Sequence, residues 1–207
     1  MHVRPMTPAG VVDHLVDLIA SRSEDRVRVL VDGHPSTHPE TLADALVDPL
    51  RARGRPVVRV RSADFLRPAS VRFERGRTDV DAWYDRVDVR ALAREVLDPW
   101  GSDGAGRYLP SLRDARTDRA TRAPYRQVPD QGVLLLDGAL LLGRGLGLDV
   151  TVHLSLRPVT IDRRTAPADR WMLRGYRRYT DDVVPEQTAD VALRVDDARR
   201  PALIEHS

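Results

Sequence analysis

Short apolar segments alternate along this chain with segments of helical spacing, and this alternation constrains the fold more than any other feature of the sequence. Because helix-like residues separate most of the apolar segments, the pattern is typical of βαβ units and of a parallel sheet covered by helices. We therefore predict an α/β fold in a single domain over residues 1–207. The predicted strands are Val27–Gly33, Pro56–Phe65, Gly132–Leu142, Asp149–Leu156 and Ala189–Val195.

The helix-like segments have apolar residues at three- and four-residue spacing. Pro49 should kink or end the helix that contains it, because proline cannot donate a backbone hydrogen bond. Residues 1–25 form an N-terminal helical region, with Val12, Leu15, Val16 and Ile19 on one stripe. The predicted helices are Met6–Ser21, Thr41–Arg53, Val80–Trp83, Val89–Leu97 and an arginine-rich helical segment, Ile161–Tyr179.

Residues 98–130 differ from the rest of the chain in composition. They are rich in Gly, Pro, Arg and Asp, and they lack a sustained apolar period. We predict an irregular segment here, with a short β-hairpin within residues 106–121.

The charged residues argue against some classes of partner. All 33 basic residues are arginine, so the chain has no lysine to place on the phosphates of a nucleotide. The formal net charge is only +2, and the arginines are interleaved with acidic residues, which argues against a nucleic-acid partner. The chain has no cysteine, which excludes disulfides and thiolate metal sites.

Nothing in the sequence predicts a membrane partner. The longest apolar run, Val133–Leu142, is far shorter than a bilayer span. No basic region followed by an apolar stretch occurs near residue 1, so no signal peptide is predicted. Together with the lack of cysteine, this favours a cytoplasmic protein.

Four stretches occur in an order that suggests a known family. They are VLVDG and TLADAL within residues 29–46, SADFLRP at 62–68, the segment 72–110, and LLLDGALLL followed by DVTVHLSL and the arginine-rich segment. Over about Val27 to Pro201, the chain resembles the uridine kinase-like branch of the P-loop nucleoside kinases. The resemblance implies a three-layer P-loop kinase fold, with a central parallel sheet of about five strands. It also implies ATP and magnesium as cofactors of the family.

The resemblance implies an acceptor site around two aspartates. Asp64 matches the family's aspartate at the end of the second strand, which acts as a base toward the nucleoside 5′-hydroxyl. A solvated or capping carboxylate is the alternative. Asp88 matches the ribose-binding aspartate, although it could equally cap the helix that begins at Val89. Tyr84 lies in the same segment and is a candidate substrate-binding residue.

The resemblance weakens where uridine kinases hold the base. Arg113 and Asp118 stand where the family carries aromatic and histidine residues, so recognition of uracil does not carry over. We expect a ligand at this place to be more polar or more anionic than uridine.

The phosphate-binding loop keeps its frame but not its key residues. A working loop reads G-x-x-x-x-G-K-[ST]. Gly33 is the first glycine, but His38, Pro39 and Glu40 replace the second glycine, the lysine and the Ser/Thr, and Thr41 follows. Loss of the ammonium and of an N–H donor, together with an added carboxylate, should weaken nucleotide binding by orders of magnitude. Reading the motif one residue later gives Thr41 the magnesium role but restores neither lysine nor glycine.

Arginines in the lid-like segment, residues 161–180, are the best argument that an anion is still bound. In a working relative, such residues stabilise the transferring phosphoryl group. The alternative is a solvated helix face whose arginines pair with nearby acids. The candidates are Arg163, Arg164, Arg170 and Arg174, with Arg177 and Arg178 in the same stretch.

Metal binding is only weakly indicated. Asp137 ends a strand where the family keeps an acidic residue near magnesium, but an aspartate before Gly138 is also typical of a turn. His34 and His38 have no evident third ligand and lie in a proline-containing loop, which argues against a metal pair. Tryptophans 83, 100 and 171 are predicted to be packing residues.

Two functions follow from these features. The first, slightly preferred, is a pseudokinase with a disabled ATP-binding loop that binds a nucleoside-like or anionic small molecule. The second is a diverged phosphotransferase that uses Asp64 as base and the lid arginines to hold a phosphorylated donor. No cofactor is certain, because the family's ATP and magnesium are doubtful here. A homo-oligomer is compatible with the sequence.

Overall fold

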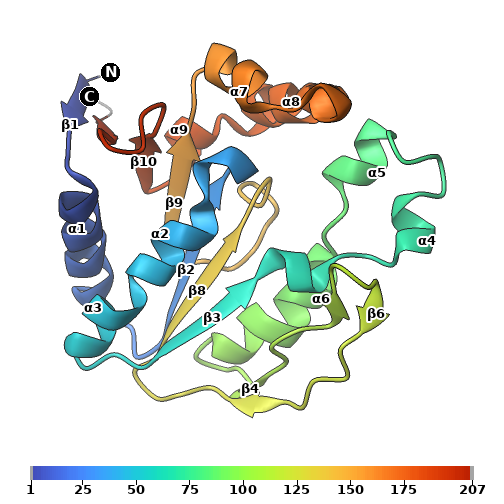
Figure 1. Cartoon of the computed structure of the whole chain (residues 1–207). Helices are drawn as coiled ribbons and strands as arrows, with labels where there is room; N and C mark the ends of the chain where they lie inside the picture. Colours follow the sequence, from blue (N-terminus) through green and yellow to red (C-terminus); the bar gives the residue numbers. More distant parts are fainter. Residues whose placement is uncertain (1, 206–207) are drawn as a thin grey trace.

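A seven-stranded sheet forms the centre of the protein in the computed structural model, which describes residues 2–205 (Figure 1). The strand order is β1-β11-β10-β9-β2-β8-β3. The five strands from β10 to β3 are parallel, which confirms the predicted α/β fold and its parallel sheet. The bounds are β1 His2–Pro5, β2 Val27–Gly33, β3 Val57–Arg61, β8 Val133–Gly138, β9 Val150–Ser155, β10 Val191–Arg194 and β11 Ala202–Glu205.

Two strands at the ends of the chain were not predicted. β11 pairs antiparallel with β10 and with β1, so Ala192 and Val3 both lie opposite Ile204. The last predicted element ends at Val195. A four-residue segment is too short for its pattern of apolar and polar residues to predict a strand. β1 is mostly exposed, and it forms by pairing with the free edge of β11.

Helices cover both faces of the sheet and give the fold three layers. One face packs against α1, α2 and α3, and the other packs against α5, α6, the π-helical turn Ala93–Leu97 and α8. The helices are α1 Pro8–Ala20, α2 Pro39–Ala45, α3 Val47–Ala52, α4 Ala69–Arg72, α5 Val80–Tyr84, α6 Val89–Leu92, α7 Pro158–Arg164, α8 Leu173–Val183 and α9 Pro185–Thr188. Short 3₁₀ helices occupy Pro35–Thr37, Ser62–Phe65, Asp98–Trp100 and Pro167–Met172.

The region predicted as one helix, Thr41–Arg53, is two helices that begin earlier, at Pro39. The break is at Leu46 because the ring of Pro49 clashes with the carbonyl four residues before it, that of Ala45. Gly54 then ends the second helix with a φ of +79°. The second predicted strand is also shorter than expected, since residues 62–65 turn into a 3₁₀ helix.

Other predicted elements are confirmed with small shifts. Helix α1 lies inside Met6–Ser21 and buries Val11, Leu15, Val16 and Ile19, while Val12 is only half-buried. The irregular segment contains the predicted hairpin, formed by β5 Arg113–Asp114 and β6 Arg119–Ala120. It also contains a second pair, β4 Arg107–Tyr108 with β7 Arg126–Gln127.

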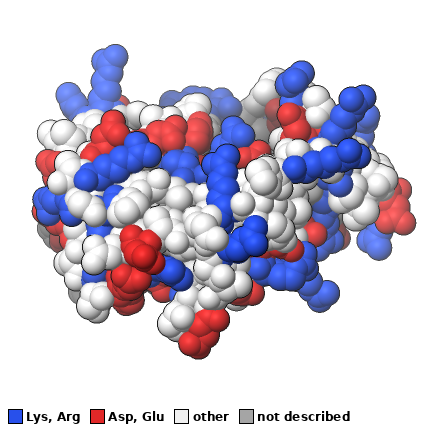
Figure 2. All heavy atoms as spheres, turned by 90° about the horizontal axis from the view of Figure 1, so that it is seen from below, with Lys and Arg blue, Asp and Glu red and all other residues white. Residues whose placement is uncertain are grey.

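Charged residues of both signs are mixed on the face of the molecule that Figure 2 shows. On the face in Figure 2, arginine and acidic side chains alternate with uncharged residues. Many of the arginines are paired, as Arg28 is with Asp149 at 2.8 Å. Within residues 2–205, no helix has the length and apolarity needed to cross a membrane.

Candidate functional site

The predicted site residues gather at the carboxyl ends of the parallel strands. Gly33 is the last residue of β2, Asp137 is the penultimate residue of β8, and Asp64 lies shortly after β3. Because these strands are neighbours in the sheet, their ends lie at one edge. This is where open α/β sheets generally bind ligands.

The turn after β2 is the segment for which the sequence predicts a phosphate-binding loop. His38 has a φ of +55° and a ψ of 59°, a left-handed conformation at the position of the second glycine. A side chain there costs roughly 1–2 kcal/mol relative to glycine. A Cβ on Gly33 would lie 2.6 Å from Thr37 Oγ1 and 2.9 Å from Leu154 Cβ, so the first glycine is required by close packing.

The amides of this turn are already bonded within it. Thr37 N donates to His34 O at 2.8 Å, and His38 N donates to Pro35 O at 3.0 Å. Ser36 N donates to His34 Nδ1 at 3.1 Å. Pro35 and Pro39 have no N–H to offer. The turn therefore has few of the free donors that hold a phosphate in a working loop.

Residues 38–41 present mixed charge at the start of α2. His38 Nδ1 lies 3.0 Å from Glu40 Oε1, and both side chains are largely exposed. Thr41 is exposed, and its N–H donates to His38 O at 2.9 Å. The carboxylate of Glu40 thus stands where a phosphate would have to approach.

The ring of His34 packs between the turn and helix α8. Its ring centroid lies 4.4 Å from that of Tyr176 on α8. Burial, with a smaller effect from the positive charge of Arg164, lowers the pKa of His34 to about 4. A neutral ring fits its role as the acceptor from Ser36 N.

The depressed pKa of His34 predicts a pH dependence of stability. The unfolded chain takes up a proton at His34 near pH 6.5, whereas the folded protein does so only near pH 4. We therefore expect the free energy of unfolding to fall by roughly 1–2 kcal/mol between these pH values, after allowance for solvent screening. Urea denaturation as a function of pH measures this. The decrease should shrink in His34→Gln and persist in the control His14→Gln; equal profiles for wild type and His34→Gln would contradict it.

Asp64 lies at the predicted strand end but is paired. Arg61 holds its carboxylate with two hydrogen bonds, from Nε at 3.0 Å and Nη2 at 3.1 Å. This hydrogen-bonded pair also raises the pKa of Arg61. A role as base toward a hydroxyl stays a prediction, and it would require the acceptor to compete with Arg61.

Asp88 and Tyr84 lie on the face of the sheet that α5 and α6 cover. Asp88 caps α6, because its Oδ1 accepts from Ala91 N at 3.0 Å, so the capping alternative is confirmed. Its ribose-binding role stays a prediction. The buried ring of Tyr84 lies between the guanidinium groups of Arg144 and Arg178, at 4.4 and 4.5 Å from its centroid.

Arg113 and Asp118 meet each other in the hairpin. Arg113 Nη1 donates to Asp118 O at 2.6 Å. The Asp118 carboxylate accepts from Ala69 N at 2.9 Å and from Arg72 at 3.0 Å, which lowers its pKa. Asp118 thus holds the hairpin against α4, and Arg113 stabilises the hairpin through Asp118. A direct role of either residue in ligand binding stays a prediction.

Asp137 is paired with an arginine. Arg59 Nη2 lies 2.5 Å from Asp137 Oδ1, and the same guanidinium contacts Asp44 at 2.8 Å. Burial raises the pKa of Asp137, and Arg59 opposes this effect. Among residues 2–205, no cluster of three or more His, Asp or Glu side chains is placed to hold a metal ion.

One lid arginine reaches the turn. Arg164 donates to Ser36 O at 3.3 Å and to Asp196 O at 2.6 Å. Arg178 instead pairs with Asp81 and Asp182. The remaining arginines of this group are exposed and form no ion pair within residues 2–205; they are Arg163, Arg170, Arg174 and Arg177.

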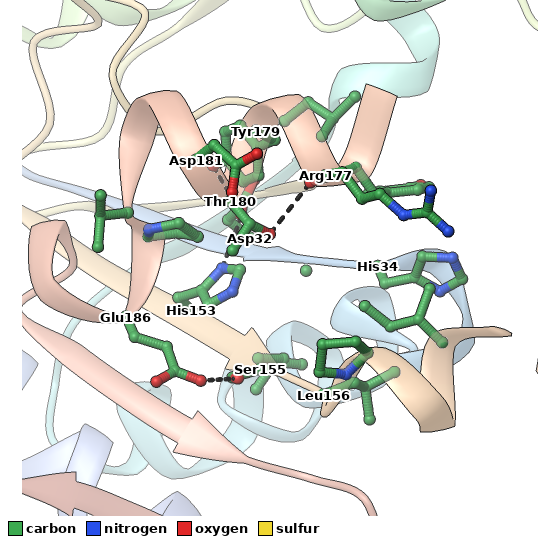
Figure 3. A pocket seen from close by; sticks show the side chains of 18 of the residues that line it. Asp32, His34, His153, Ser155, Leu156, Arg177, Tyr179, Thr180, Asp181 and Glu186 are labelled. Atoms are coloured by element: carbon green, nitrogen blue, oxygen red, sulfur yellow. Dashed lines mark hydrogen bonds and ion pairs between the residues drawn. The ribbon is translucent and has the colours of Figure 1, made fainter. Parts of the chain in front are cut away.

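A cavity of about 560 Å³ lies between the ends of β2 and β9 and helices α7, α8 and α9 (Figure 3). At its base, the fully buried carboxylate of Asp32 accepts hydrogen bonds from His153 Nδ1 at 2.9 Å and from the hydroxyl of Tyr179 at 3.0 Å. None of these three residues was predicted from the sequence. The one sequence feature that pointed to this network was Asp32, a charged residue in the mostly apolar strand before Gly33.

Comparisons with known proteins identify the fold but no family. No family model matches the sequence, and neither does any curated protein. Solved structures do match. One is described as a possible uridine kinase from Bacillus stearothermophilus, with a TM-score of 0.71 and 19% identity over 87% of this chain and 96% of that one.

Two further structures have the same arrangement. A candidate fructose transport system kinase from Silicibacter sp. TM1040 gives a TM-score of 0.59 and 20% identity, over 89% of this chain and 90% of that one. The protein YGR205w gives 0.61 and 10%, over 94% and 99%. At these identities the likeness concerns the fold, and this chain has the three-layer α/β fold of P-loop kinases.

Proposed function

We propose that this protein is a uridine kinase-like pseudokinase, which does not hold ATP at the turn after β2 and binds a nucleoside-like or anionic small molecule on its acceptor side. The observation that carries the proposal is the state of the donors in the turn. The amides of Ser36, Thr37 and His38 are bonded internally, and two further positions are prolines.

The donor chemistry of the turn does not fit magnesium triphosphate. A triphosphate carries several negative charges, and the chain has no lysine to meet them. Glu40 adds a carboxylate, and Arg59 neutralises Asp137, the residue nearest the magnesium role. We therefore derive no catalytic step through ATP or magnesium.

Exposed arginines support an anionic ligand. Arg163 lies on α7, Arg170 on the 3₁₀ helix that follows and Arg174 on α8, and none of them forms an ion pair within the described part of the chain. A guanidinium without a protein carboxylate can bind a phosphate or carboxylate with two parallel hydrogen bonds.

Calorimetry with ATP–magnesium, GTP–magnesium, uridine and uridine monophosphate tests the proposal. We expect affinity for a nucleoside or its monophosphate, and no affinity for either triphosphate up to about 1 mM, an energy of about −4 kcal/mol. Micromolar binding of a magnesium triphosphate would contradict the pseudokinase.

The second candidate is a diverged phosphotransferase with Asp64 as base. The contact of Arg164 with the carbonyl of Ser36 favours it, because a cation then stands beside the turn. Turnover of a phosphorylated donor that disappears in Asp64→Asn, but not in the control Asp130→Asn, would establish this candidate in place of the first.

A further inference from the structure

The cavity between β2, β9 and helices α7 to α9 adjoins the turn after β2, because Gly33 and His34 line part of it. Its described lining does not include Asp64, Asp88 or Tyr84. Its walls are largely apolar, and its volume of about 560 Å³ lies within the usual range of small-molecule sites. The apolar walls include Leu140, Leu154, Leu156, Ile161, Leu173 and Val184.

The base of the cavity is a polar network whose inner hydrogen bonds are complete. Asp32 Oδ1 accepts from Leu141 N at 3.0 Å, and Oδ2 accepts from His153 and Tyr179. The Tyr179 hydroxyl also accepts from Leu142 N at 3.0 Å. A fully buried carboxylate is tolerated only when it is satisfied in this way. Asp32 and Tyr179 therefore have their hydrogen-bond partners within the protein.

His153 is the member of the network that still has a vacant position. A carboxylate can only accept, so Nδ1 of His153 carries the proton that is donated to Asp32. In the neutral form of the ring, Nε2 is then the acceptor, and no hydrogen bond to it is formed by residues 2–205. Figure 3 shows the ring between Asp32 and the Ser155–Glu186 pair, inside the cavity.

The charges around the cavity disfavour an anion. Four carboxylates line it, those of Asp32, Asp162, Asp181 and Glu186, against one arginine, Arg177. Arg194 pairs with Glu186, and His153 bonds to Asp32, so Asp162 and Asp181 are the least compensated. In a partly desolvated cavity, these carboxylates attract a cationic ligand and repel an anionic one.

We propose that this cavity is a second small-molecule site, which takes an apolar compound bearing an amine or hydroxyl group that donates a hydrogen bond to Nε2 of His153. The apolar body would lie against the leucine, isoleucine and valine side chains. This site does not depend on the pseudokinase proposal, because it uses neither the turn amides nor the acceptor aspartates.

Three probes with one apolar body test the choice of polar group. They are 2-phenylethylamine, 2-phenylethanol and phenylacetate, each titrated into the full chain while the ring signals of His153 are followed by NMR. His153→Gln assigns those signals. We expect the amine and the alcohol to bind with dissociation constants near 1 mM, and phenylacetate to bind at least tenfold more weakly.

A blocking variant locates the binding. Thr180 lines the cavity from α8 and is exposed, so Thr180→Trp should occlude the site and weaken binding of the amine at least tenfold. The control is Thr78→Trp, at an exposed threonine outside the cavity lining. The proposal fails if no probe shifts the His153 signals at 20 mM, if phenylacetate binds as well as the amine, or if a folded Thr180→Trp protein binds like wild type. If that variant does not fold, the wild-type titrations decide alone.

Discussion

The combined substitution His38→Gly, Pro39→Lys and Glu40→Thr is expected to raise affinity for ATP–magnesium by at least a hundredfold. Glycine suits the left-handed φ of +55° at position 38. Lysine restores an ammonium and an N–H donor, and threonine removes a carboxylate and supplies a hydroxyl. Each charge-assisted hydrogen bond is worth roughly 1.5–3 kcal/mol, so two are enough for the expected gain. Calorimetry of the two proteins with ATP–magnesium measures it.

A matched variant separates the backbone from the charge. His38→Gly with Pro39→Gln and Glu40→Thr has the same restored backbone but lacks the ammonium, and it should gain much less affinity. Binding by wild type as tight as by the lysine variant would mean that the natural turn is not disabled. A folded lysine variant without any gain would mean that more than these three residues blocks the nucleotide, with Pro35 and the His34 ring as the next obstacles.

Asp32→Ala is expected to destabilise the protein by about 3–5 kcal/mol, because it removes one partner of a buried, hydrogen-bonded pair. Three donors, on Leu141, His153 and Tyr179, would lose their acceptor in a fully buried place. The network joins β2 and β9 to α8, so its loss should loosen the helix that also supports His34 through Tyr176. Urea denaturation at pH 7 gives the change in free energy directly.

A surface aspartate provides the control for this prediction. Asp130 is paired with Arg26 at 3.3 Å, but its side chain is 90% exposed, so Asp130→Ala should cost less than about 1 kcal/mol. A double-mutant cycle of Asp32→Ala with Tyr179→Phe should show coupling of at least 0.5 kcal/mol. A loss below 1 kcal/mol in Asp32→Ala would mean that the network does not hold α8 to the sheet.

The parallel sheet and most of the helices that cover it could be predicted from the amino-acid pattern alone. Strand β8 contains the continuous apolar run Val133–Leu136, because a central parallel strand is buried on both faces. Helix α1 could be predicted from an apolar stripe at regular spacing. The end of α3 could be predicted from Gly54, because glycine readily adopts the left-handed conformation that often follows a helix. These features depend on neighbours along the chain, so local physical rules suffice to predict them.

Which polar side chains have a hydrogen-bond or ion-pair partner, and which do not, became visible only in the folded protein. The resemblance to nucleoside kinases pointed to Asp64 and Asp137, but the arginine partners Arg61 and Arg59 were not predicted. Nor could the sequence reveal that Asp32 meets His153, 121 residues away, beside a cavity. A hydrogen bond is directional and short, so it forms only when folding brings two particular atoms together, and no pattern along one segment encodes that meeting.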